Sequence, residues 1–276
     1  MHQRFNFSRG TLNVRFESAW WNGRIGTFGA LAVLTGTAWW STLVRAHAMG
    51  SMTQGLVQVG RAMPFASGVG AFTTMWVIMM AAMMFPTISQ TVLSHRLQAR
   101  ERGEGAFATV SFVAGYMAIW TLTGFVPLAT LLATRVLGHF DSWLSGFEGS
   151  MLAIAGLYQF TSWKNSCLLT CRQPQSILKA RNLGRGVLGH GRLGASQGLH
   201  CLGCCWALMS VLLVVGLMNT EWMAGIAVVF LAERNWRHGI GLTRLVGLVL
   251  TLLGMAVIAH PTVLAAIAHA NHSIMR

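Results

Sequence analysis

The chain has 276 residues, of which 54% are hydrophobic and only 10% are charged, and its formal net charge is +13. A soluble domain is roughly 25% charged, so this chain has too few polar groups to cover the surface of a soluble monomer. A disordered chain is excluded as well, because disorder requires low hydrophobicity. The composition predicts an all-α, polytopic transmembrane bundle that forms one domain over residues 1–276. The positive charge then indicates basic loops beside membrane spans, not nucleic-acid binding.

Seven apolar stretches predict seven membrane helices, since a span needs about 20 apolar residues. A basic segment, 1–25, precedes them, and a basic, glycine-rich loop, 172–195, separates the fourth from the fifth. The sixth stretch is short and directly follows the fifth, so residues 218–220 form a tight reversal or the sixth stretch is re-entrant. The seven stretches are 26–44, 68–93, 106–137, 149–171, 196–218, 219–232 and 243–270.

The distribution of basic residues predicts the orientation of these helices. With seven crossings and a cytoplasmic N-terminus, fifteen lysines and arginines fall on the cytoplasmic side and four on the opposite side. Cytoplasmic loops of membrane proteins carry such an excess. We therefore expect a multi-pass protein of a bacterial inner membrane, with 1–25 and 172–195 in the cytoplasm.

The second apolar stretch is rich in methionine and contains one proline. Residues at spacings of four lie on one face of a helix, so two neighbouring columns of thioethers are predicted. Thioethers can pass on Cu(I) without holding it tightly, although methionine also serves as an adaptable core residue. Pro86 is expected to kink this helix and to free one backbone carbonyl. The methionines are Met75, Met79, Met80, Met83 and Met84.

All five cysteines fall in the fourth and fifth stretches. The predicted orientation places them at one depth, near the cytoplasmic ends of two sequence-adjacent helices, where the reducing compartment disfavours structural disulfides. A cluster of thiols suits soft metals, above all Cu(I) and also Zn. Buried cysteines as plain apolar packing are the alternative. The candidate metal ligands are Cys167, Cys171, Cys201, Cys204 and Cys205, joined by Met209.

Three polar residues could support such a site. Lys164 lies within the fourth stretch, where an unpaired ammonium is costly, so we expect it to face the interior and pair with a carboxylate. Glu233 suits this role best by depth. His200 lies one turn before Cys204. A bound haem stays open, although the sequence shows no histidine pair at matching depth on facing helices.

Four motifs between residues 75 and 234 resemble a bacterial family of unknown function that is catalogued as predicted metal-binding integral membrane proteins. The resemblance implies a membrane protein and a metal site, and it leaves the metal and its use open. Arg234 stands where the family more usually has lysine. The motifs are Met75-Trp76-x2-Met79-Met80-x2-Met83-Met84-x-Pro86, Tyr158-Gln159-x4-Lys164-x2-Cys167-Leu168-x2-Cys171-Arg172-x-Pro174, Gly198-x2-Cys201-x-Gly203-Cys204-Cys205-Trp206-x-Leu208-Met209, and Met218-Asn219-x2-Trp222-Met223 with Glu233.

These observations favour a membrane protein that binds a soft metal, Cu(I) before Zn, for transport or delivery and not for catalysis. Its expected partners are the lipid bilayer and a metal chaperone or another membrane or periplasmic subunit, with no nucleic acid. Two alternatives remain open. The cysteines could exchange disulfides in a membrane oxidoreductase, or they could be inert in an accessory subunit. The sequence contains no ATP-binding loop, so pumping by this chain alone is not expected.

Overall fold

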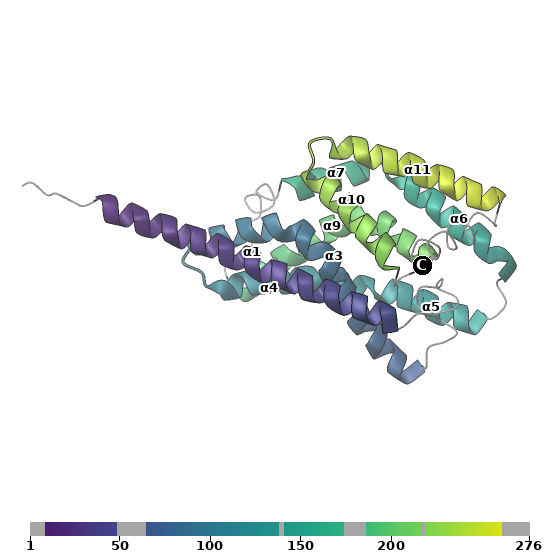
Figure 1. Ribbon diagram of the computed structural model, residues 1–276, viewed down its shortest axis with the longest axis horizontal. Coiled ribbons are helices and arrows are strands. Elements are labelled where there is room, and N and C mark those ends of the chain that lie inside the picture. Colours follow the sequence, from purple (N-terminus) through teal and green to yellow (C-terminus); the bar gives the residue numbers. More distant parts are fainter. Residues whose placement is uncertain (1–8, 49–64, 138–140, 174–185, 217–218, 261–276) are drawn as a thin grey trace, which may run out of the picture.

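A computed structural model describes residues 9–48, 65–137, 141–173, 186–216 and 219–260, and Figure 1 shows their arrangement. The described residues form helices and turns without a strand, which confirms the all-α class. The seventh predicted stretch continues to residue 270, and its last part lies outside these residues. The helices are α1 (Arg9–Ala48), α3 (Phe65–Glu101), α4 (Ala106–Thr123), α5 (Phe125–Leu137), α6 (Asp141–Tyr158), α7 (Ser162–Arg172), α9 (Val187–Val215), α10 (Thr220–Asn235) and α11 (Gly239–Ala259).

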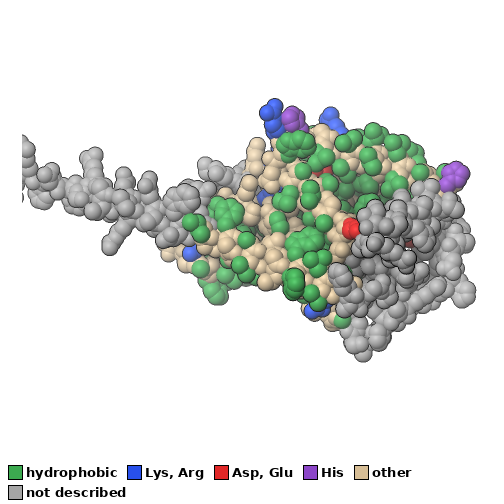
Figure 2. Space-filling view, viewed as in Figure 1, with side chains coloured by type: hydrophobic (Ala, Val, Ile, Leu, Met, Phe, Trp, Pro, Cys, Tyr) green, Lys and Arg blue, Asp and Glu red, His purple; other side chains and the backbone are tan. Residues whose placement is uncertain are grey.

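Five helical segments are long and apolar enough to cross a membrane, which supports a membrane protein. The outer surface has the character that lipid contact requires, because hydrophobic side chains cover much of the face seen in Figure 2. On α11, for example, Leu245, Leu252 and Met255 are more than half exposed. The five segments are Ile25–Ala46, Val69–Glu101, Ala106–Thr130, Val187–Val215 and Gly239–Ala259.

Two of the seven predicted helices are broken, so the number of helices differs from the prediction. The third breaks after Thr123, because Pro127 has no N–H to donate to the Thr123 carbonyl. The fourth breaks between α6 and α7. There Thr161 adopts an extended conformation and its side chain accepts a hydrogen bond from the backbone N–H of Lys164. This N-cap starts a new helix.

The fifth predicted helix is longer than expected, since α9 begins at Val187 and not at Ser196. The glycines near its start are poor helix formers, but they allow α9 to approach α4 closely. A side chain on Gly194 would overlap the Phe112 carbonyl oxygen, and one on Gly115 would overlap the Gly191 carbonyl oxygen. Small residues permit such close packing between membrane helices. Residues 187–195 of the predicted loop 172–195 are therefore part of a helix.

The remaining elements surround this α4–α9 pair. Helix α3 packs against both α1 and α4, while α6 lies alongside α11 and also contacts α9. The short helices α7 and α10 both contact α9, and they also contact each other. Gly216 follows the last residue of α9, and the Asn219 side chain caps α10 by accepting a hydrogen bond from the backbone N–H of Trp222. Met218, in the predicted reversal 218–220, lies outside the described residues.

Pro86 lies inside α3 and leaves the carbonyl of Ala82 without its usual helical donor. The indole N–H of Trp39 on α1 donates to that oxygen at 3.0 Å. The predicted free carbonyl is therefore present, and it ties α1 to α3.

Replacing Trp39 with phenylalanine should lower the free energy of unfolding by about 1 to 3 kcal/mol, because it leaves the Ala82 carbonyl unsatisfied. Unfolding in mixed micelles, followed by circular dichroism, measures this loss. The neighbouring Trp40 is exposed, so Trp40→Phe is the matched control. An equal loss in both variants would contradict the role of the hydrogen bond.

Candidate metal centre

Four thiols meet in the interior between α7 and α9. Cys201 and Cys205 are one turn apart on α9, and Cys204 lies beside them. Cys171 reaches them from α7. All four side chains are buried. We call the sulfur atoms of these four residues the sulfur cluster. The predicted convergence of the two cysteine groups is therefore present for four of the five cysteines.

Three sulfurs of the cluster, those of Cys201, Cys204 and Cys205, all lie within 4.8 Å of one another and fit one metal ion. The Sγ–Sγ distance is 3.9 Å between Cys201 and Cys205, 3.4 Å between Cys204 and Cys205, and 4.0 Å between Cys204 and Cys171. Sulfur atoms that share an ion at a bond length of about 2.3 Å lie about 3.8 to 4.0 Å apart. Small side-chain shifts would bring these thiolates to such a geometry.

Polar side chains hold two of the sulfur atoms. The hydroxyl of Tyr116 on α4 donates a hydrogen bond to Cys201 Sγ at 3.3 Å. The amide Nε2 of Gln197 lies 3.9 Å from Cys171 Sγ and donates to it. Hydrogen bonds to a ligand atom orient it and stabilise its charged form. The cluster therefore has the outer support that a metal site requires.

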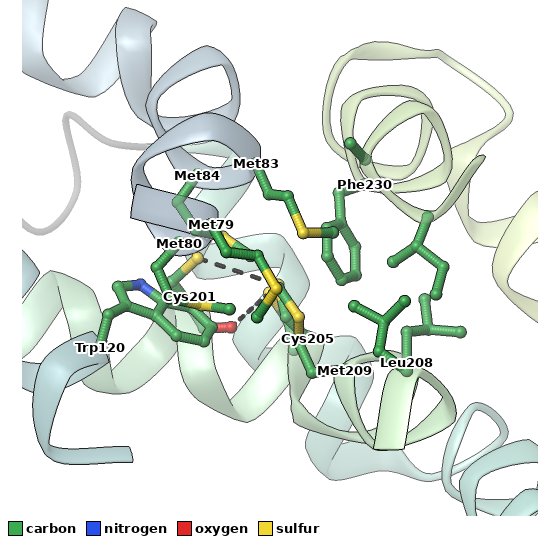
Figure 3. Close-up of a cluster of buried hydrophobic side chains, with 14 of the residues drawn as sticks. Met79, Met80, Met83, Met84, Trp120, Cys201, Cys205, Leu208, Met209 and Phe230 are labelled. Carbon is green, nitrogen blue, oxygen red and sulfur yellow. Dashed lines mark hydrogen bonds between the residues drawn. The ribbon is translucent and has the colours of Figure 1, made fainter. Parts of the chain in front are cut away.

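The predicted methionine columns lie in the same buried region. Figure 3 shows methionine side chains extending from α3 into the space beside Cys201 and Cys205, with Met209 of α9 nearby. All of these residues belong to one continuous core cluster with the four cysteines. The buried methionines of α3 are Met75, Met79, Met80, Met83 and Met84. Thioether and thiol sulfurs thus share one compartment of the core.

The position of the three α9 cysteines along their helix differs from the prediction. Cys201 lies fourteen residues from the first residue of α9 and fourteen from the last, so it sits at the middle of the helix. At 1.5 Å per residue, the N-terminal end of α9 is about 21 Å away. The three thiols of α9 are therefore not near its start, because the glycine-rich first turns extend the helix beyond its predicted start. Cys171 does lie at the end of its helix, since it is the last residue but one of α7.

Two of the candidate residues lie apart from the sulfur cluster. The Cys167 sulfur lies against the backbone of Gly203, where a side chain would clash with it. Nδ1 of His200 lies 2.7 Å from the Ser196 carbonyl oxygen. Both residues line a cavity of about 780 Å³, which has mainly apolar walls and is bordered by Met209.

Lys164 and Glu233 form the ion pair that the sequence predicts. The Lys164 ammonium lies 3.0 Å from Glu233 Oε2 and 3.1 Å from Oε1, and it also donates to the side-chain oxygen of Gln159. Lys164 is fully buried and Glu233 is 2% exposed. The pair joins the first turn of α7 to the last turn of α10, and thus fixes the helix that carries Cys171.

The structure contains a buried histidine pair on two facing helices, so the expectation that the sequence has no such pair is wrong. Nε2 of His95 on α3 lies 3.0 Å from Nδ1 of His190 on α9. Glu104, in the turn after α3, lies 2.9 Å from the other nitrogen of His190. One sequence pattern could have indicated the pair. His95 follows Met84 by eleven residues, and His190 precedes Cys201 by the same number.

Comparisons with known proteins add one finding. No curated protein and no solved structure matches this chain. A family model described as "PpoB2: Copper chaperone" matches residues 73–257. This range includes the sulfur cluster and the methionines of α3, and it supports the metal-binding part of the resemblance. Since the match covers more than half of the sequence, the chain belongs to the PpoB2 family of copper chaperones.

Proposed function

We propose that this protein binds copper as Cu(I) at the sulfur cluster, within a bacterial inner membrane, and delivers it to a partner protein. The observation that carries this proposal is the set of Sγ–Sγ distances, 3.4 to 4.0 Å, among buried cysteines of two helices. Membership in a family of copper chaperones supports copper as the cargo.

The chemistry of the donor set favours Cu(I) over other metals. Thiolates and thioethers are soft ligands, which select Cu(I) and, with less preference, Zn. Mg²⁺ and Ca²⁺ require oxygen ligands, and the four residues of the cluster supply none from their side chains. The neutral methionines bind more weakly than thiolates, so they suit an approach route along α3 toward the cysteines. Met75 and Met84 lie at the two ends of this route.

Delivery requires that the ion enters and leaves, and cysteines at the middle of α9 suit transfer between the two ends of that helix. The protein contains no nucleotide-binding motif, so the energy for transfer comes from the affinity of the acceptor. A metal chaperone or a membrane or periplasmic subunit is the acceptor that this arrangement requires.

Metal analysis of anaerobically purified protein tests the proposal. After loading with Cu(I), the wild-type protein should contain copper with sulfur neighbours, measured by mass spectrometry and X-ray absorption. The variant Cys201→Ser/Cys204→Ser/Cys205→Ser should lose this sulfur-bound copper, because a serine hydroxyl is a hard, weak ligand for Cu(I). Zn(II) loading of the same proteins decides between the two soft metals.

Cys167→Ser is the matched control, since Cys167 lies on Gly203 outside the sulfur cluster. It should retain the sulfur-bound copper. Equal copper in the wild type and the triple variant would contradict the proposal. Absence of copper, together with thiols that oxidise and reduce reversibly, would favour the oxidoreductase. In that case Cys171 and Cys204, 4.0 Å apart on separate helices, are the pair to examine.

A further inference from the structure

The histidine pair lies outside the sulfur cluster, yet its geometry resembles a metal site. His95 and His190 are 3% and 8% exposed, and their facing nitrogens are 3.0 Å apart. The two rings are nearly perpendicular, with an interplanar angle of 88°. Two imidazole nitrogens that face each other inside a protein can share either a proton or a metal ion.

Glu104 determines which nitrogen of His190 is available. Its Oε2 atom lies 2.9 Å from Nε2 of His190 but is not aligned for a hydrogen bond. A small rotation of the carboxylate would let Nε2 donate to it, which leaves the lone pair on Nδ1, toward His95. A carboxylate that holds the outer nitrogen of a histidine is the usual outer support of a metal-bound imidazole. The arrangement therefore prepares His190 as a ligand.

His95 is fixed by packing and not by a second hydrogen bond. Its ring stacks on Phe112 with centroids 4.5 Å apart. Its Nδ1 atom is buried and has no hydrogen-bond partner among the described residues. Buried polar atoms normally have partners, so the unpartnered Nδ1 of His95 is an exception. The facing nitrogens are at hydrogen-bond distance, 3.0 Å, and they have to move apart by up to about 1 Å to hold an ion at about 2.0 Å from each.

The position of the pair relates it to the sulfur cluster. His95 and Met84 on α3, and His190 and Cys201 on α9, are each eleven residues apart, which is three helical turns or about 16 Å. Each histidine therefore faces the same side of its helix as the sulfur ligand. Gln197 lies between the histidine and cysteine levels of α9, and its buried Oε1 has no hydrogen-bond partner in the described part of the chain.

We propose that His95 and His190 form a second copper site, which takes Cu(I) between two imidazole nitrogens at the end of α3 and α9, with Glu104 orienting His190. The residues just before Glu104, from Glu101 to Gly103, are exposed, so this end of the bundle is accessible from water. Imidazole is a suitable ligand for copper. An ion that enters at this end of the bundle binds the histidine pair first and then moves to the sulfur cluster.

The test uses the full-length protein in detergent, loaded anaerobically with Cu(I) that is buffered by a chelator of known affinity. X-ray absorption distinguishes nitrogen from sulfur neighbours. The variant with serine at Cys171, Cys201, Cys204 and Cys205 should retain about one copper ion per chain with nitrogen neighbours. The variant His95→Gln/His190→Gln should lose this ion and keep the sulfur-bound one, which also shows that it is folded.

Glu104→Gln should weaken the nitrogen-bound copper by about 10- to 100-fold, as expected for loss of an outer-shell carboxylate. His260→Gln, at an exposed position after α11, is the control and should change nothing. The proposal is overturned if the four-serine variant holds no nitrogen-bound copper, or if the double histidine variant retains it. If the wild-type protein held nitrogen-bound copper but no sulfur-bound copper, the proposed function would be overturned and this histidine site would stand.

Discussion

Replacing Lys164 with methionine should lower the free energy of unfolding by about 3 to 5 kcal/mol. The carboxylate of Glu233 would then remain buried without a positive partner, since it is 2% exposed and lies 3.0 Å from the ammonium. Methionine has a similar length and fills the same space, so the loss reports the charge and not a cavity. Unfolding of the purified protein in mixed micelles at increasing fractions of SDS measures this difference.

The double variant Lys164→Met/Glu233→Met separates charge from packing. Removing both members of a buried ion pair is often neutral or even stabilising, because no charge is left without a partner. The double variant should therefore be more stable than Lys164→Met alone. Losses that simply add would show that the two side chains act independently, which would contradict the ion pair.

This pair shows what can be predicted from sequence alone. A lysine within an apolar stretch is costly in lipid, so it demands a carboxylate, and the chain has only seven acidic residues in all. The scarcity of partners at matching depth identified Glu233. The same logic identified the cysteines: residue types that are rare, concentrated and chemically specific restrict the possible arrangements, and four of the five thiols do meet.

The position of the α9 cysteines along their helix is not predictable in the same way. Hydropathy predicts a span that starts at Ser196, after a basic, glycine-rich loop, and glycine is a poor helix former. In the folded protein the absence of side chains at Gly191 and Gly194 allows α9 to contact α4, and this packing outweighs the low propensity. Hydropathy along one segment contains no information about the helix against which it will pack.

The break before Lys164 was a local signal that hydropathy concealed. Thr161 precedes Lys164 by three residues, and its side chain caps the first turn of α7. Such a cap is a recognisable helix start, but the apolar residues on both sides suggested one continuous span. The histidine pair was missed for another reason. His95 and His190 are far apart in the sequence, and the rotation of α3 and α9 that joins them is set by tertiary packing.

Replacing Gly194 with alanine should destabilise the protein by about 3 kcal/mol, the upper part of the usual range for overpacking. The added methyl group would overlap the carbonyl oxygen of Phe112. Backbone atoms of two packed helices cannot move aside as a flexible side chain can, so α9 has to shift away from α4. The gain in helix propensity, about 1 kcal/mol, offsets only part of this cost.

Gly225→Ala is the matched control, because a methyl group at Gly225 on α10 meets no atom within 4 Å. It should be neutral or slightly stabilising.

The two variants can then be compared in copper binding as well as in unfolding. Tyr116 on α4 donates to Cys201 on α9 across the interface that Gly194 keeps close. A shift of α9 lengthens this hydrogen bond and disturbs the sulfur cluster, so Gly194→Ala should also bind copper more weakly. Unchanged copper affinity in a destabilised Gly194→Ala protein would show that the cluster is held by α7 and α9 without help from α4.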